Sequence, residues 1–167
     1  MKRSKLLLLF ALSFLSKAAV SQNVQMNILT RNMGIVNISK ITYLEVTVCN
    51  TDSKGVAVPE FKLRPQLNFP AGIIIIPDTG HILPSGWTVI QNSGNIIRLS
   101  NGTDKIPANE CRTILIAMKG FEIGGPSTIA GNIGFSNGIA PGSGSGSSTT
   151  GDYPADNSST SSIKVIR

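Results

Sequence analysis

The chain offers few residue types suited to catalysis. Its 167 residues include one His, two Cys and nine Asp or Glu. A general base needs a nucleophile and an orienting group, yet His81 lies alone in the turn-rich stretch PDTGHILP, so we place it in a surface loop. No serine lies in a Gly-x-Ser-x-Gly turn followed by the elements of a hydrolase fold. We therefore predict no catalytic residue, no cofactor and no enzymatic activity.

One group of oxygen-bearing side chains is a weak candidate for a cation site. Asp152, Asp156 and Asn157 lie close together near the C-terminus. Ca²⁺ takes six to eight oxygen ligands, so three residues fall short of a complete site. We keep them as a weak calcium candidate and predict no other metal site.

Three aromatic residues are candidates for ligand stacking. A sugar ring packs against an aromatic face while the polar edge of a Trp or Tyr remains free to hydrogen-bond. The chain has one Trp and two Tyr, namely Trp87, Tyr43 and Tyr153. For Trp87 the alternative is a place in the hydrophobic core.

The first 21 residues have the layout of a secretory signal peptide. Basic residues lie within 1–5, an apolar run covers 6–15, and small residues precede Ser21. Ten apolar residues are too few to cross a bilayer core about 30 Å thick, so we expect no stable membrane span. We predict cleavage after Ser21 and a location outside the cell or on its surface.

Removal of this segment changes the charge balance. It takes away four of the 15 Lys and Arg residues, which leaves 11 basic against 9 acidic groups, a net charge of +2 rather than +6. The remaining chain has no basic patch with interleaved aromatic residues. Nucleic-acid binding is therefore not expected.

The rest of the chain, residues 22–167, shows the pattern of one all-β domain. Short alternating or β-branched runs recur between turn signals, and no segment has a sustained helical period. This favours an immunoglobulin-like β-sandwich of about seven to nine strands. The candidate strands cover residues 24–28, 35–38, 41–50, 61–63, 67–69, 72–76, 87–91, 95–99, 111–119, 128–136 and 161–166.

A Gly- and Ser-rich stretch over 140–151 interrupts the pattern before the last strand. Its composition is that of a flexible coil. It forms either a long loop within the domain or a tether that lets Ser161–Ile166 reach a neighbouring subunit. In the second case the protein would assemble with copies of itself by β-strand addition.

Four stretches, in order, resemble the bacterial conserved-repeat surface domain, a domain of unknown function (number eleven). They are YLEVTVCNT at 43–51, NFPAGI at 68–73, IPANECRTILIAM at 106–118 and GDYPADNSSTSSIKV at 151–165. The resemblance implies an extracellular, non-enzymatic structural or adhesive module and carries no catalytic residues. Here the domain occurs once rather than in tandem, and the Gly/Ser insertion is unusual for it.

This fold allows the two cysteines to be paired. Cys49 ends one strong strand and Cys111 begins another, and in an immunoglobulin-like sandwich these strands are antiparallel neighbours. Cys49 shares a face with Tyr43 and Glu45 rather than with the core. We predict a Cys49–Cys111 disulfide, with two free thiols as the alternative.

The sequence thus favours a secreted or cell-surface structural or adhesive protein without catalytic activity. Its expected partner is a cell-surface protein or a glycan. A filament subunit that binds other copies of itself is one alternative, and a small carbohydrate-binding module is another.

Overall fold

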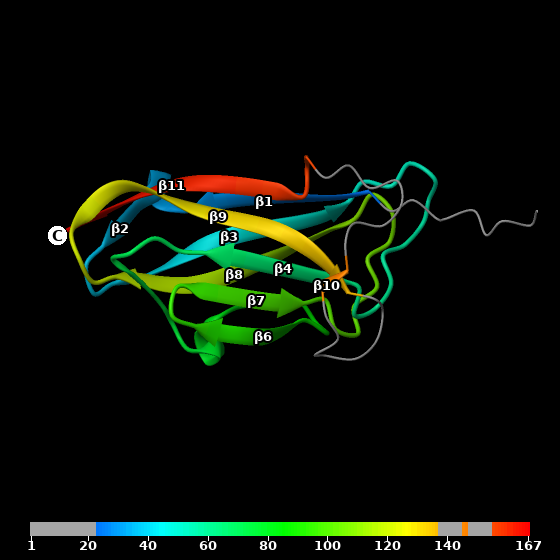
Figure 1. Ribbon diagram of the computed structural model, residues 1–167, viewed down its shortest axis with the longest axis horizontal. Helices are drawn as coiled ribbons and strands as arrows, with labels where there is room; N and C mark the ends of the chain where they lie inside the picture. Colours follow the sequence, from blue (N-terminus) through cyan, green and yellow to red (C-terminus); the bar gives the residue numbers. More distant parts are fainter. Residues whose placement is uncertain (1–22, 137–144, 147–154) are drawn as a thin grey trace, which may run out of the picture.

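The computed structural model describes residues 23–136, 145–146 and 155–167. The predicted signal peptide at 1–21 lies outside the described residues, as does all of the Gly/Ser-rich stretch at 140–151 except Ser145 and Gly146. The described chain is built almost entirely of β-strands, with two single-turn 3₁₀ helices (Figure 1). This confirms the predicted all-β fold.

Two sheets pack face to face (Figure 1). Sheet A has the strand order β1-β3-β8-β5, with β1 at Val24–Thr30, β3 at Ile41–Asn50, β8 at Cys111–Gly120 and β5 at Ile73–Ile75. Sheet B has the order β2-β11-β9-β4-β7-β6, and β10 pairs with β9 beside it. Its strands are β2 (Ile35–Asn37), β11 (Ser158–Ile166), β9 (Gly124–Ser136), β4 (Leu63–Asn68), β7 (Ile96–Ser100), β6 (Thr88–Ser93) and β10 (Ser145–Gly146). The 3₁₀ helices are η1 (Asn32–Gly34) and η2 (Asp78–Gly80).

The core lies between the inward faces of the two sheets. In β3 the side chains from Leu44 to Asn50 alternate between buried and partly exposed, whereas β8 buries a continuous run at 116–118. Leu44, Val46 and Val48 of β3 and Ile114 and Ile116 of β8 are fully buried. From sheet B the core receives Leu63, Leu67, Ile97, Leu99, Ile129, Ile133, Phe135, Ile163 and Val165.

One pair of predicted strands is a single strand in the structure. We expected separate strands at 61–63 and 67–69, whereas β4 runs without a break from Leu63 to Asn68 and includes Pro65. β4 pairs with β9 along its whole length but with β7 only from Gln66 onward. Pro65 therefore lies where β4 has a neighbour on one side only, and the missing N–H breaks no ladder there.

The last strand is longer than expected and closes one side of the sandwich. β11 begins at Ser158 rather than Ser161 and lies between β2 and β9 of sheet B. Its serine hydroxyls face the outer edge of β1. The N–H groups of Ile28 and Thr30 donate to Oγ of Ser159 (3.1 Å) and Ser161 (3.3 Å). The hydroxyl groups of β11 thus take the place of a neighbouring strand for β1.

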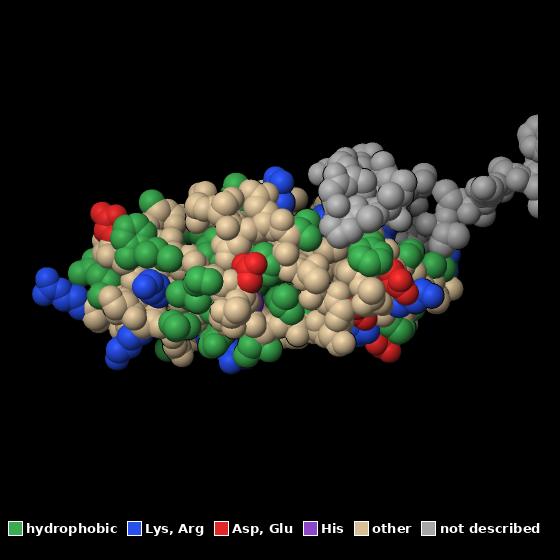
Figure 2. Space-filling model, turned by 90° about the horizontal axis from the view of Figure 1, so that it is seen from below, with side chains coloured by type: hydrophobic (Ala, Val, Ile, Leu, Met, Phe, Trp, Pro, Cys, Tyr) green, Lys and Arg blue, Asp and Glu red, His purple; other side chains and the backbone are tan. Residues whose placement is uncertain are grey.

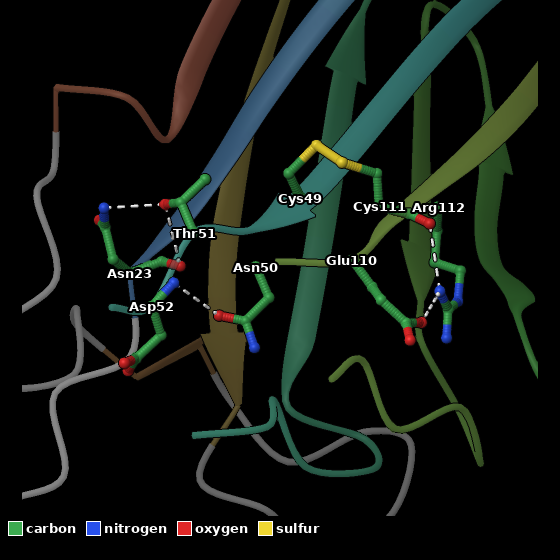
Figure 3. Close-up of a disulfide and its surroundings, with 8 residues drawn as sticks. All are labelled: Asn23, Cys49, Asn50, Thr51, Asp52, Glu110, Cys111 and Arg112. Carbon is green, nitrogen blue, oxygen red and sulfur yellow. Dashed lines mark hydrogen bonds and ion pairs between the residues drawn. A yellow bond between two sulfur atoms is a disulfide. The ribbon is translucent and has the colours of Figure 1, made fainter. Parts of the chain in front are cut away.

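Asn50 holds together the end of the sandwich where β3 stops (Figure 3). Its side chain is fully buried, and Nδ2 donates to the carbonyl oxygens of Val56 (2.8 Å) and Ile106 (3.0 Å). Its Oδ1 accepts the N–H of Asp52 at 3.1 Å. Because three chain segments converge on this amide, the Asn that ends β3 has a structural role.

Candidate interaction surface

The outward side of sheet A carries four of the nine large hydrophobic side chains that are exposed in the described part of the chain. Strand register places these side chains in rows across the sheet. One row runs Leu29–Glu45–Leu115–Ile82. A second runs Ile41–Lys119–Ile74, and Tyr43 lies opposite Ala117 in the row between them. We call this outward surface, formed by Leu29, Ile41, Tyr43, Ile74, Ile82 and Leu115, the A face.

The A face leaves much apolar surface in contact with solvent. Leu29 is 56% exposed, Ile41 58%, Ile74 40% and Ile82 55%. Single exposed aliphatic residues are ordinary, but adjacent ones that share a sheet face are a feature of binding surfaces. The charged groups are few and partly neutralised, since Arg31 pairs with Glu45 at 3.2 Å. The A face therefore has the chemistry of a protein-binding surface.

A disulfide lies at the polar end of the same sheet face, where Thr47 and Thr113 continue the rows (Figure 3). Cys49 and Cys111 are directly opposite each other in the β3–β8 ladder, and their sulfur atoms are bonded. The predicted disulfide is confirmed, including its position away from the core. It joins the two central strands of sheet A and so limits their separation.

His81 covers an edge of β8 rather than lying free in a loop. The segment 76–82 runs along that edge, where Ile82 pairs with Leu115. Between these contacts, the N–H of Ala117 donates to Nδ1 of His81 at 3.1 Å. Burial lowers the pKa of His81, and the nearby negative charge of Asp78 opposes that effect in part. His81 thus lies in a loop segment as expected, but its imidazole is half-buried and replaces a missing backbone acceptor for β8.

A groove lies between the edges of the two sheets on the side that carries β6. Its volume is about 580 Å³, and its lining includes Ile75, Pro77 and Asp78 on one wall and Ile90 and Asn92 on the other. Asn92 Nδ2 donates to the Ile76 carbonyl oxygen (3.0 Å) and to Asp78 Oδ1 (2.9 Å) at one end. We call this feature the β6 groove. In the view of Figure 2, hydrophobic side chains are numerous on the left half of this side of the molecule.

Trp87 is a core residue, so it is not a ligand-stacking residue. Its side chain is 5% exposed, and Nε1 donates to Asp104 Oδ2 at 2.7 Å. Arg112 binds the same carboxylate through Nε (2.8 Å) and Nη2 (3.2 Å). These hydrogen bonds raise the pKa of Arg112. Asp104 thus ties the indole to β8, and no face of the indole is open to a sugar.

Of the other predicted ligand residues, the structure describes Tyr43, Asp156 and Asn157. Tyr43 is partly exposed on the A face, while Tyr153 lies outside the described residues. Asp152 of the calcium candidate also lies outside them. The carbonyl oxygens of Asp156 and Asn157 accept the N–H groups of Met26 and Ile133. Among the residues that the structure describes, no three His, Cys, Asp or Glu side chains are grouped to hold a metal ion.

The A face was not predicted, although one signal of it is present in the sequence. Ile73–Ile76 is a run of four isoleucines in which no polar residue alternates. A strand of this kind has an apolar side chain on both faces, one inward and one outward. In the structure Ile75 points to the core and Ile74 to the A face.

No helix in the described part of the chain is long and apolar enough to span a membrane.

Comparison with solved structures places the fold among immunoglobulin-like sandwich domains. The chain is similar to the major pilin subunit BcpA of Bacillus cereus, with a TM-score of 0.54 and 12% identity over 86% of this chain and 40% of that chain. It is also similar to a cohesin module of a family 33 glycoside hydrolase from Clostridium perfringens, with a TM-score of 0.51 and 8% identity over 87% of this chain and 96% of the module. A third similar structure is a CARDB domain from Pyrococcus furiosus, with a TM-score of 0.48 and 11% identity over 88% of this chain and 90% of that chain. No protein-family model and no curated protein sequence matches the chain. At these identities the likeness is one of fold, and the chain is an immunoglobulin-like β-sandwich.

Proposed function

We propose that the protein is an exported structural or adhesive module of a bacterial surface and that it binds a partner protein through the A face. The observation that carries the proposal is the row Leu29–Glu45–Leu115–Ile82 with its neighbours Ile41 and Ile74, which exposes aliphatic side chains on one rigid sheet. Burial of such side chains against a partner is favourable at roughly 25 cal/mol per Å² of apolar surface.

Four further observations support an extracellular, non-catalytic role. Structural disulfides are typical of exported proteins, and Cys49–Cys111 is one. The sequence resembles the conserved-repeat surface domain, and the first 21 residues have the pattern of a signal peptide. Two proteins of similar fold are a major pilin subunit and a cohesin module.

The alternatives from the sequence have less support. A carbohydrate platform needs stacking aromatic rings, and Trp87 is buried, which leaves Tyr43 as the one described candidate. Assembly by exchange of the last strand requires β11 to leave its own sheet. In this chain β11 pairs with β9 from Ser158 to Val165 and buries Ile163 and Val165.

The proposal is tested by retention of envelope proteins on the immobilised protein. Residues 22–167 are coupled to beads and incubated with cell-envelope extract of the bacterium that produces the protein. Ile82→Lys puts a charge in the apolar row at an exposed position and should reduce retention of the partner by about tenfold. Lys164→Glu changes an exposed residue of β11 on sheet B and should leave retention unchanged. Equal retention by both variants contradicts the proposal.

A further inference from the structure

A sandwich of two open sheets has four outer edges, and three of them are protected here. The exposed N–H and C=O groups of an edge strand are a template for another strand, so proteins usually cover or interrupt them. At the β1 edge, the N–H of Met26 donates to the Asp156 carbonyl oxygen at 2.9 Å. Those of Ile28 and Thr30 donate to Ser159 and Ser161. This edge is covered by β11.

The second and third edges are protected in other ways. On the far side of sheet A, β5 has only three residues, and the edge of β8 beyond it is covered by segment 76–82. Ile76, His81 and Ile82 each hydrogen-bond to β8 there. On sheet B, the edge strand β2 has three residues and is followed by the turn at Ser39. Short edge strands offer little template for pairing.

The fourth edge, β6, has no paired segment along it in the described chain, although its Asn92 side chain hydrogen-bonds to Ile76 and Asp78 at one end. Five of its six residues pair with β7 on one side, and no strand of the described chain pairs with the other side. The sequence TVIQNS contains no charged residue and no Pro, which are the usual blocking residues of an edge. A bulge at Ile90 is its one irregularity, and that residue lines the β6 groove.

The groove beside this edge has the chemistry to receive an extended peptide. A strand paired to β6 would point alternate side chains inward between the sheets, toward Ile75, Pro77 and Ile90. Aliphatic side chains suit that lining. Asp78 is the one charged residue of the lining. A basic side chain at the corresponding end of the peptide would therefore be favoured.

We propose that β6 accepts a segment of about six residues from a partner protein as an added strand, and that this segment alternates aliphatic residues and carries a basic residue next to Asp78. The inference deepens the proposed function, on which it rests for the protein-binding role, and adds a second contact distinct from the A face. A second copy of this chain paired β6 to β6 fits less well. Six residues of edge contact bury far less than the roughly 1,200 Å² of a stable interface, and they leave the groove unfilled.

The test uses a defined peptide and residue-resolved amide exchange. The probe is the synthetic peptide Lys-Val-Thr-Val-Thr-Val-Gly, added to isotope-labelled residues 22–167 with the disulfide intact. Binding should slow hydrogen exchange of β6 amides by about tenfold or more at saturation, because outward N–H groups gain acceptors. The control peptide has Pro in place of the central Val and should leave exchange unchanged.

Two protein variants separate this inference from the proposed function. Ile90→Lys places a charge at an exposed edge position and should weaken peptide binding by about tenfold while retention of the A-face partner persists. Ile82→Lys should reduce retention of the A-face partner and leave peptide binding at β6 unchanged. The inference is overturned if about 1 mM peptide leaves hydrogen exchange of the β6 amides unchanged, or if the peptide slows exchange mainly on the A face. It is also overturned if the protein alone has twice the mass of one chain in solution and Ile90→Lys restores the mass of one chain.

Discussion

The imidazole of His81 accepts the backbone N–H of Ala117 through Nδ1, at a position where the edge of β8 has no backbone partner. The acceptor role requires the neutral ring with its proton on Nε2. Nε2 is buried and has no hydrogen-bond partner in the described part of the chain. Protonation of Nδ1 would remove the acceptor and leave the Ala117 N–H unpaired.

Stability should therefore fall as the solution is made mildly acidic. The pKa of His81 is lowered in the folded protein, so the unfolded chain binds the proton more tightly. The loss begins as pH falls through the unfolded value near 6.5 and is complete below the lowered folded value. Urea unfolding at a series of pH values from about 7.5 to 5 measures it.

Two substitutions of His81 distinguish the effect of its protonation on stability from the effect of losing the hydrogen-bond acceptor. His81→Asn keeps an acceptor near the Ala117 N–H and should abolish the His-dependent slope between pH 7 and 5.5. His81→Leu removes the acceptor and should cost about 1–3 kcal/mol at neutral pH. If wild type and His81→Asn show the same pH slope in this range, the assigned role of the imidazole is wrong.

The disulfide should contribute to stability without determining the fold. Replacement of both cysteines by Ser should lower the free energy of unfolding by up to about 4 kcal/mol, the chain-entropy value for a loop of this length. The β3–β8 ladder has nine paired residues and should persist. Calorimetry gives the loss, and amide exchange in β8 shows whether the ladder remains. Loss of β8 protection in the folded state contradicts this expectation.

Asp104 should be among the polar residues most sensitive to substitution. It accepts hydrogen bonds from Trp87 and from two nitrogens of Arg112, and its side chain is 12% exposed. Asp104→Ala leaves two donors without their acceptor and should cost about 3 kcal/mol. Glu110→Ala removes an exposed partner of the same Arg112 and should cost less than about 1 kcal/mol. Similar losses for both variants would contradict the account.

The hydrogen bonds from β1 to the serines of β11 should contribute measurably to stability. Ser161→Ala removes the acceptor of the Thr30 N–H and should cost about 1 kcal/mol, and Ser159→Ala should act similarly at Ile28. Amide exchange of Ile28 and Thr30 should accelerate in the respective variant. Ser162→Ala, at an exposed position of the same strand, is the matched control and should leave both rates unchanged.

The main elements of the fold were predictable because β3 alternates apolar and polar residues from Leu44 to Val48 and β8 carries a long aliphatic run. The same alternation placed Cys49 and Cys111 on the outward face. Other elements depend on tertiary contacts that a local pattern does not contain. The run SSTSS at 158–162 is too polar to indicate a strand, yet its hydroxyls bind the edge of β1. Gly131 weakens the β9 pattern, but a Cβ there would lie 2.5 Å from the side chain of Ile28.

The candidate site was predictable only in part for a similar reason. Exposure of Leu29, Ile41 and Ile82 follows from the register of β1, β3 and β8 and from the bridge at Ile82, which no single run of residues specifies. Trp87 was an open choice between core and ligand contact, and its burial depends on Asp104, 17 residues away.

Photo-cross-linking from the A face tests the central claim most directly. A photoreactive amino acid is placed at Ile82 on the A face, or at Lys164 on the outward side of sheet B, in the protein produced by its own bacterium. The account predicts a discrete cross-linked product with an envelope protein from position 82 and none from position 164. Cross-linking from position 164 alone, or from neither position, would contradict the assignment of the A face as the binding surface.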